Sequence, residues 1–341
     1  MPRVSESRSM TSSEQSRPKA RRGLLWLVVA LLVAFGLYSA GWFWLAGRVR
    51  GEAAQTIAAL NGKGINADCA NLTVSGYPLR FAVSCDTLAY EDDAHNVAAS
   101  SGSLNAVATL LRPFSPSADF RGPLRTTAPG MPPLWIDWDH LRAEAGLSWP
   151  TPASVRLTAE GLSGQTDPED GDPVSLFSAG QAETELRPDG QDLVASGRFG
   201  DVEIDADAIG GRMVPAFDAA GEATLKNGVA VLQANTGNLR GQAVEIANLE
   251  LSSGEARVSL SGPLSVDADG LIDARLNIRL TNPKAVAAVL AGIIPEQKRQ
   301  IEQGFAALAM LGSAPSMPLV IVKGKASLGF IPLGKIKAIG E

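Results

Sequence analysis

The chain has 341 residues, a formal net charge of −6 and a charged fraction of only 19%. This acidic balance excludes the basic footprint of a nucleic-acid-binding protein. Gly (35) and Pro (21) are abundant, which is typical of many short strands joined by turns. After the first fifty positions nearly 300 residues remain, enough for one large domain or two ordinary ones.

The N-terminal region predicts a tail followed by a membrane anchor. Residues 1–22 contain many Ser, Arg and Gln residues and predict a disordered cytoplasmic tail. Residues 23–46, GLLWLVVALLVAFGLYSAGWFWLA, are 24 residues without a charge. As a helix they would be roughly 36 Å long, enough to cross a hydrocarbon core of about 30 Å. Residues 47–64 predict a helical stalk that ends at its Gly residues.

Aromatic and basic residues flank the apolar stretch. Trp26 lies near one end, and Trp42, Phe43 and Trp44 lie near the other, as in an aromatic belt at the membrane interface. Four basic residues precede the stretch and two follow it, which favours a cytoplasmic N-terminus. A cleaved signal peptide is the alternative. We expect an uncleaved single-pass anchor in a bacterial inner membrane, with a periplasmic C-terminal domain.

The two cysteines, Cys69 and Cys85, lie on either side of the turn signal at residues 76–78, Gly-Tyr-Pro. Two strands folding back at this turn would bring the thiols together, and a disulfide would form in an oxidising compartment. Cys85 is in phase with the apolar residues of its strand, whereas Cys69 is out of phase, which predicts a bulge. Two buried free thiols are the alternative. A metal site is not expected, because two ligands alone do not make one.

Period-two alternation dominates the rest of the chain. Residues 272–280 place apolar side chains at even positions and polar ones at odd positions, and residues 155–160, 202–208 and 256–260 behave similarly. Such strands are dry on one face and wet on the other, as in antiparallel sheets. Residues 65–341 therefore predict a mainly β, antiparallel domain. Asn227-Gly228, between two alternating runs, predicts a hairpin.

Residues 283–312 depart from the alternation. Asn282 can cap a helix that starts with Pro283, and Pro295 opens a second helical segment. These residues predict a helical pair laid against the sheet. The chain then returns to strands at 318–322 and 324–331.

Catalytic and metal-binding motifs are absent from the sequence. His140 lies beside Asp139, but no nucleophile is identifiable, so we expect it to be solvated or structurally bonded. The acidic runs 205–210 and 267–273 lack a calcium-binding loop. Trp135, Trp138 and Trp149 are expected to anchor the sheet, with a ligand platform as the alternative. We expect no catalytic, cofactor or metal residues, no cofactor and no enzymatic activity.

The long apolar strand faces pose the main question. Few helices are available to cover them, so two sheets must close as a sandwich, or one sheet must curl into an open groove. A groove beside a bilayer could hold acyl chains. A closed core is the ordinary alternative.

Two resemblances add to this interpretation. The stretch CANLTVSGYPLRFAVSCD after a single anchor, with the later strands ending in GPLSVDADGLIDARLNIRLTNP, resembles the uncharacterised bacterial family "domain of unknown function 2125" (DUF2125). Its most specific part is carried by Cys69, Gly76, Tyr77, Pro78 and Cys85, and the family implies no activity. More distantly, the anchor and the SLSGPLSVDADGL-type strands are similar to AsmA-like envelope proteins, whose curled sheets imply lipid movement or envelope assembly.

The sequence therefore leaves three functional hypotheses. The first is a periplasmic protein that binds or shields lipid, or supports envelope assembly, through its apolar face. The second is a structural module that contacts other envelope proteins. The third, a hydrolase, requires His140 and nearby carboxylates to converge in one pocket.

Overall fold

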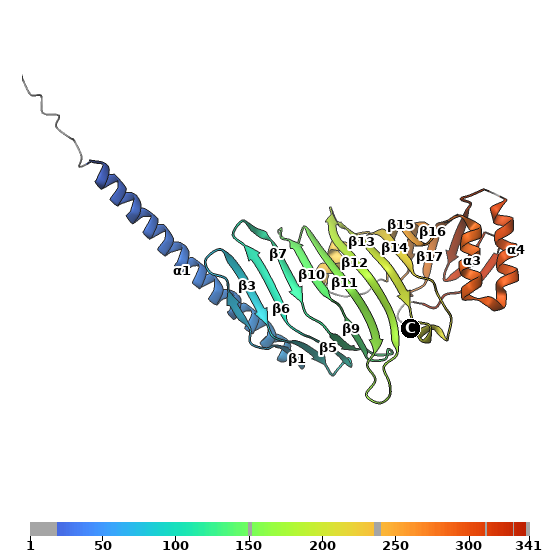
Figure 1. Ribbon diagram of the computed structural model, residues 1–341, viewed down its shortest axis with the longest axis horizontal. Coiled ribbons are helices and arrows are strands. Elements are labelled where there is room, and N and C mark those ends of the chain that lie inside the picture. Colours follow the sequence, from blue (N-terminus) through green and yellow to red (C-terminus); the bar gives the residue numbers. More distant parts are fainter. Residues whose placement is uncertain (1–18, 149–151, 235–239, 311, 330, 339–341) are drawn as a thin grey trace, which may run out of the picture.

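The computed structural model describes residues 19–148, 152–234, 240–310, 312–329 and 331–338 (Figure 1). Its helices are α1 (Lys19–Asn61), α2 (Gly228–Ala234), α3 (Pro283–Ile293) and α4 (Lys298–Ala309), with the 3-10 turns η1 (Asp207–Ile209) and η2 (Pro295–Gln297). The first ten strands are β1 (Ile65–Cys69), β2 (Thr73–Ser75), β3 (Arg80–Cys85), β4 (Leu88–Asp92), β5 (Val97–Ser101), β6 (Leu104–Thr109), β7 (Arg112–Phe120), β8 (Leu124–Thr127), β9 (Leu134–Asp137) and β10 (His140–Gly146). The remaining strands are β11 (Ser154–Thr166), β12 (Ser175–Asp189), β13 (Asp192–Ile204), β14 (Phe217–Leu225), β15 (Ala243–Ser253), β16 (Ala256–Val266), β17 (Ile272–Thr281), β18 (Ser316–Val322), β19 (Lys325–Leu328) and β20 (Ile331–Lys335).

Helix α1 contains the predicted membrane segment and most of the predicted stalk in one uninterrupted helix. Its N-terminal part projects away from the sheet, and its C-terminal part packs beside β1 and β2 (Figure 1). Among the described residues, it is the one helix long and apolar enough to cross a membrane, as an anchor or as a signal sequence. It ends at Asn61, where Gly62 and Gly64 close the turn into β1. The helix begins at Lys19, and residues 1–18 of the predicted tail lie outside the described part of the chain.

The described strands form a single antiparallel sheet that does not close on itself. Its first ten strands run as two ladders that both end on β11. One ladder follows the order β2–β3–β6–β7–β10, and the other follows β1–β4–β5–β8–β9. The chain passes from one ladder to the other within a few residues, for example between β9 and β10, so consecutive strands form the two halves of a bent strand (Figure 1). The fold confirms the predicted mainly antiparallel sheet and excludes a two-sheet sandwich among these strands.

Close contacts between glycine and aspartate mark the bend. Gly122 faces the carboxylate of Asp137, and Gly161 (φ +61°) faces the carboxylate of Asp139, so closely that a Cβ on either glycine would collide with it. Only glycine permits both this approach and the positive φ of residue 161. Asp137 and Asp139 are therefore parts of the bend, and neither is positioned as a partner for His140.

From β11 onward the sheet is a meander of long strands (Figure 1). The hairpin predicted at Asn227-Gly228 is wrong. Asn227 has a φ of +51°, and the residues after it form α2 instead of a strand. The carboxylate of Asp192 accepts hydrogen bonds from the Asn227 amide (2.9 Å) and the Lys226 ammonium (2.8 Å). These bonds end β14 there, and β15 pairs with β14 in place of the predicted strand.

The predicted helical pair is confirmed as α3 and α4. The Asn282 side chain accepts a hydrogen bond from the Ala285 amide (3.3 Å), and Pro283 occupies the first helical position. Helix α3 packs on β16 and β17 at the end of the sheet far from α1 (Figure 1). Val286 of α3 is 3% exposed and packs with Leu280 of β17, which is 5% exposed. This end of the sheet therefore has an ordinary covered core.

Candidate functional site: an open apolar face

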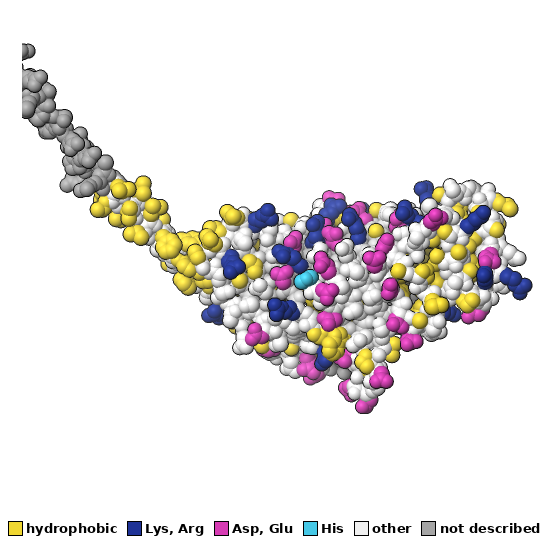
Figure 2. All heavy atoms as spheres, in the orientation of Figure 1, with side chains coloured by type: hydrophobic (Ala, Val, Ile, Leu, Met, Phe, Trp, Pro, Cys, Tyr) yellow, Lys and Arg dark blue, Asp and Glu magenta, His cyan; other side chains and the backbone are white. Residues whose placement is uncertain are grey.

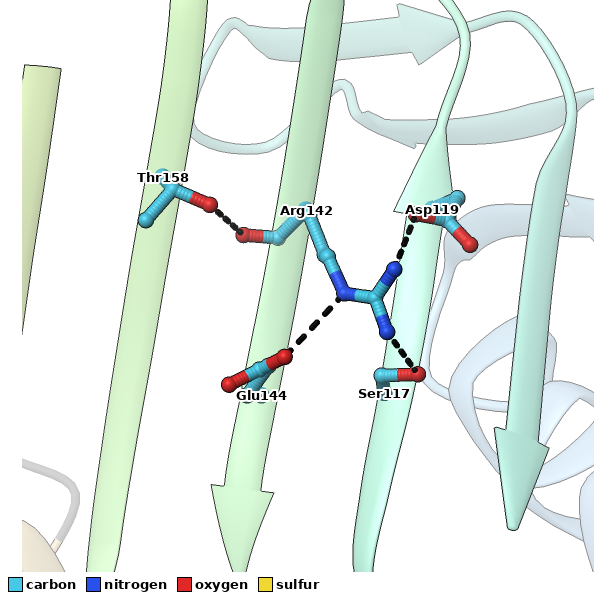
Figure 3. Close-up of polar contacts among 5 residues, drawn as sticks. All are labelled: Ser117, Asp119, Arg142, Glu144 and Thr158. Atoms are coloured by element: carbon cyan, nitrogen blue, oxygen red, sulfur yellow. Dashed lines mark hydrogen bonds and ion pairs between the residues drawn. The ribbon is translucent and has the colours of Figure 1, made fainter. Parts of the chain in front are cut away.

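One face of the sheet is polar along its whole length. Residues in register across neighbouring strands share a face, and one such row runs through Asp119, Arg142, Thr158, Glu183 and Arg198. Figure 3 shows part of it: the Arg142 guanidinium donates to Ser117 Oγ (3.0 Å) and Glu144 Oε1 (3.2 Å) and lies 3.7 Å from Asp119 Oδ1. Charged side chains of both signs are spread over the sheet in Figure 2. These exposed pairs satisfy one another across strands and stabilise the sheet only weakly.

Arg156 continues the same pattern on the polar face. It donates to Glu185 (2.9 Å) and lies 3.4 Å from Glu183. These carboxylates, Glu185 first, raise the pKa of the Arg156 guanidinium. A cation on β11 held by two carboxylates on the adjacent strand β12 serves as a cross-strand brace.

The opposite face carries an unbroken apolar row. Following the register from strand to strand, this row contains one residue from each of eleven strands: Cys85, Leu104, Phe120, Leu141, Ala159, Ala182, Phe199, Ala219, Leu251, Val258 and Leu280. Eleven strands about 4.8 Å apart span roughly 48 Å. The row is therefore longer than the hydrocarbon layer of a single leaflet, which is about 15 Å thick.

The middle of this face has no cover among the described residues. We call it the open apolar face, and it comprises Val155, Leu157, Leu186, Phe199, Leu249 and Leu251 on β11–β13 and β15. These side chains are 36% to 46% exposed. A buried core would hold them below a tenth exposed, as it does Leu280 in the same apolar row. Apolar side chains in such a continuous exposed set indicate a binding surface.

Two hollows lie at opposite ends of the sheet. One, of about 290 Å³, lies beside α3 and is lined mainly by aliphatic side chains, including Leu251, Val258 and Val289. The other, of about 510 Å³, lies between α1 and the sheet and is lined by residues such as Trp42, Leu79 and Phe81. The apolar surface thus runs from the N-terminal helix to the C-terminal helical pair.

Cys69 and Cys85 lie at disulfide distance, with their Cα atoms 5.4 Å apart. The hairpin at Gly76-Tyr77-Pro78 is present as β2 and β3, but Cys69 belongs to β1, which pairs with β4. The predicted bulge is therefore a break at Asn71 (φ +53°), where the chain changes ladder. The pair joins the two ladders at the bend. Between residues 47 and 158, Cys85 is the one described side chain that is buried, at 4% exposure.

The residues considered for chemistry remain separate. His140 is exposed on the polar face in register with Glu160. The Trp135 ring is covered by the Arg125 guanidinium (4.4 Å), and Trp138 Nε1 donates to the Phe120 carbonyl (3.0 Å). Trp149 lies outside the described residues. No group of three or more metal-ligating side chains is present among the residues that the structure describes.

The predicted interface aromatics divide into two sets. Trp26 and Trp44 are exposed on α1. Phe43 is exposed as well, but its ring stacks on that of Tyr77 (5.3 Å). Trp42 instead faces the sheet, where its ring contacts those of Tyr77 (5.5 Å) and Phe81 (5.7 Å) and its Nε1 donates to the Arg80 carbonyl (3.3 Å). The sequence signal for this contact was the Gly-Tyr-Pro turn itself, which presents an exposed aromatic ring next to α1.

One family model matches the chain. It covers residues 42–337, which include the last turns of the apolar stretch and nearly all of the sheet, and it is described as "Uncharacterized protein conserved in bacteria (DUF2125)". A comparison with curated proteins gave no match. This description names no reaction, ligand or partner.

Proposed function

Since this chain belongs to the DUF2125 family, to which no activity is attached, we propose its function from its surface: it is a single-pass inner-membrane protein whose periplasmic domain holds lipid acyl chains on the open apolar face. The observation that carries the proposal is the apolar row, which continues toward α3 and in which Phe199 and Leu251 are exposed, together with the exposed side chains of the open apolar face beside it. Each methylene moved from water onto this face stabilises the complex by about 0.8 kcal/mol.

The proposed anchorage has support beyond hydropathy. Tyr38 Oη donates to the Pro78 carbonyl, and Ser39 Oγ lies 2.6 Å from the Tyr77 hydroxyl. Cleavage at the small residues 39–41 would remove the first of these contacts and would take the Tyr38 side chain out of the lining of the hollow next to α1. A helix that packs on the mature domain is therefore expected to stay attached.

The proposed orientation follows from charge and sulfur chemistry. Arg17, Lys19, Arg21 and Arg22 precede the apolar stretch, and Arg48 and Arg50 follow it, which favours a cytoplasmic N-terminus. A disulfide between Cys69 and Cys85 requires an oxidising compartment, which the periplasm provides.

The proposed role is binding or shielding lipid in support of the envelope, without catalysis. We do not propose a hydrolase, because Asp137 and Asp139 lie against glycines at the bend and His140 pairs in register with Glu160 on the polar face. The distant likeness to AsmA-like envelope proteins stays a prediction. It agrees with an open apolar sheet but adds no residue to the argument.

The test is purification of the full chain in a mild detergent, followed by mass spectrometry of the co-purified lipids. We expect phospholipid with the native chain and its loss in Leu157→Glu, which charges the open apolar face. Thr158→Glu is the matched control, because residue 158 follows 157 on the same strand and points to the polar face. A lipid-free native chain would contradict the proposal, and capture of a protein on this face would favour the structural and interaction module.

A further inference from the structure

A second exposed apolar surface lies where α1 meets the sheet. We call it the membrane corner, and it comprises Leu79, Leu110, Leu111 and Phe114 at the β2–β3 and β6–β7 turns. All four are exposed, and Leu111 is 93% exposed. In Figure 2 hydrophobic side chains cover α1 and continue onto the adjoining end of the sheet, where a few Lys or Arg side chains lie among them. Isolated exposed leucines are ordinary, but a set gathered beside an apolar helix is not.

The contacts of the β2–β3 turn place this corner at the level of the membrane segment. The Tyr77 ring lies 6.4 Å from that of Phe35 and 5.3 Å from that of Phe43. Counted from Gly23 at 1.5 Å per residue, Ser39 is roughly 24 Å along the helix, inside a hydrocarbon core of about 30 Å. A turn held at Phe35–Phe43 therefore reaches the depth of the acyl chains or their border.

The neighbouring turn is tied to the same depth. The Leu110 amide donates to the Leu79 carbonyl (3.0 Å), which joins the β6–β7 turn to the β2–β3 turn. Arg80 and Arg112 flank these apolar residues, and both are exposed. They lie on the two strands next to β6, each paired in register with Thr109. Apolar tips bordered by guanidinium groups match a phospholipid interface, where the tips enter the acyl region and the cations meet phosphate.

We propose that the domain is docked on the bilayer as well as tethered to it, with the membrane corner inserted into the leaflet that α1 leaves. The occupant of this surface is the bilayer around the anchor, because the exposed residues are continuous with the apolar helix and lie at its depth. Docking rests on the proposed membrane location of α1 but goes beyond the proposed function, since it holds whether or not lipid occupies the open apolar face. Its consequence is a fixed tilt that opens the hollow beside α1 toward the acyl chains.

The test uses the full chain in vesicles of phosphatidylethanolamine and phosphatidylglycerol, with a nitroxide on a single introduced cysteine. Electron paramagnetic resonance then compares collisions with oxygen, which partitions into lipid, and with a water-soluble nickel chelate. The labelled variants are Leu111→Cys and Phe114→Cys at the corner, Leu31→Cys within α1 as the membrane reference, and Met310→Cys as the aqueous reference. Met310 is 87% exposed at the far end of the molecule, so it matches Leu111 in exposure but not in place.

Docking predicts that the oxygen-to-nickel collision ratio at 111 and 114 is several-fold higher than at 310 and approaches the ratio at 31. A ratio at both corner positions equal to that at 310, with the label at 31 still protected, would overturn docking while leaving the anchor intact. An exposed label at 31 would instead overturn the proposed membrane location, and docking with it. The unsubstituted chain, treated with the label in parallel, measures any labelling of Cys69 and Cys85.

Discussion

Strands β11–β15 and strands β16–β18 carry the same alternation of apolar and polar side chains, yet their apolar faces are treated differently. In the second group, α3 covers the face, and Leu280 and Val286 are nearly inaccessible to water. In the first group α2 packs only at one end of β13, where Leu193 is 7% exposed, and Leu186 and Leu251 are each more than two-fifths exposed. The alternation thus determines which face of a strand is apolar. Whether that face becomes a buried core or an exposed surface depends on whether another element, such as α3, packs over it.

The N-terminal ladders present a third solution to the same problem. Helix α1 packs mainly along β1 and β2 and leaves most of these strands uncovered. In this region Cys85 is the one buried side chain among those described from residue 47 to 158. A cross-link between the ladders then supplies what packing does not, as in small domains with thin cores. The comparison of covered and uncovered strands leads to four predictions.

The largest effect is expected from a cavity in the covered region. Leu280→Ala should lower the free energy of unfolding by about 2 to 5 kcal/mol, because the deleted methylenes were packed against α3. Leu186→Ala removes the same atoms from the open apolar face and should cost about 1 kcal/mol or less, since much of that side chain is already in contact with solvent. Urea unfolding of both full-length variants in the same detergent measures the difference. Equal losses would mean that the two regions are covered alike.

The cross-link should rank second. Replacing both cysteines, Cys69→Ala with Cys85→Ala, should cost about 3 kcal/mol, because the disulfide closes a loop of 16 residues that otherwise gains freedom on unfolding. Dithiothreitol should lower the urea midpoint of the native chain by a similar amount and leave that of the double variant unchanged. Insensitivity of the native chain to the reductant would show that the pair is not oxidised.

The cap of the covering helix should matter less. Asn282→Ala removes the acceptor of the Ala285 amide and should cost about 1 kcal/mol. The loss should be local to the covered region, so hydrogen exchange should quicken at α3 more than in β11–β13. Matched acceleration in both regions would argue that α3 and the open face unfold as one unit.

The smallest effect is expected at the exposed pair of Asp192 and Lys226. The hydrogen bond from Lys226, and then that from the Asn227 amide, lowers the pKa of Asp192 below its usual 3.8. Asp192 in turn raises the pKa of Lys226 above its usual 10.5. A carboxyl group whose pKa is lower in the folded state stabilises the fold at pH values above its unfolded-state pKa. This stabilisation is lost as the pH falls through the folded-state pKa. An ammonium group whose pKa is higher in the folded state stabilises the fold at pH values below its unfolded-state pKa. This stabilisation is lost as the pH rises through the folded-state pKa.

The pair should therefore contribute across the broad interval between the two ordinary pKa values and weaken outside it. Asp192→Asn should lower the urea midpoint slightly at pH 7, and the difference from the native chain should shrink below pH 3.8. A difference that grew on acidification would contradict the assigned sign. Glu203→Gln on the same strand offers a control carboxylate.

Sequence patterns predicted the helices and strands better than they predicted which of these elements pair or pack together. The uncharged stretch, the alternation and Asn282-Pro283 each depend on local chemistry, so the long apolar helix, the sheet and the helical pair followed from them. The two-ladder pairing could not be predicted, because it depends on contacts such as Asp139 with Gly161, which lie 22 positions apart. The hairpin at Asn227 failed because the Asp192 carboxylate, 35 positions away, ends the strand there.

The candidate site illustrates the same limit. Periodicity identified the apolar residues of β11, but a sandwich core and an open groove require the same alternation. The decision lies in whether another layer covers Leu157 and Leu186, and no local pattern encodes that. The membrane corner was missed for a related reason: Leu111 and Phe114 look like ordinary turn and edge residues until α1 is placed beside them.

The most direct measurement is photocrosslinking in living bacteria with a benzophenone amino acid at position 186 or 185 of the full chain. The two positions are consecutive on β12 and point to opposite faces, so they differ in surroundings but not in depth along the sheet. The account predicts a phospholipid adduct at 186 and none at 185. Equal labelling at both positions, or no lipid at 186, would contradict the claim that this face holds acyl chains.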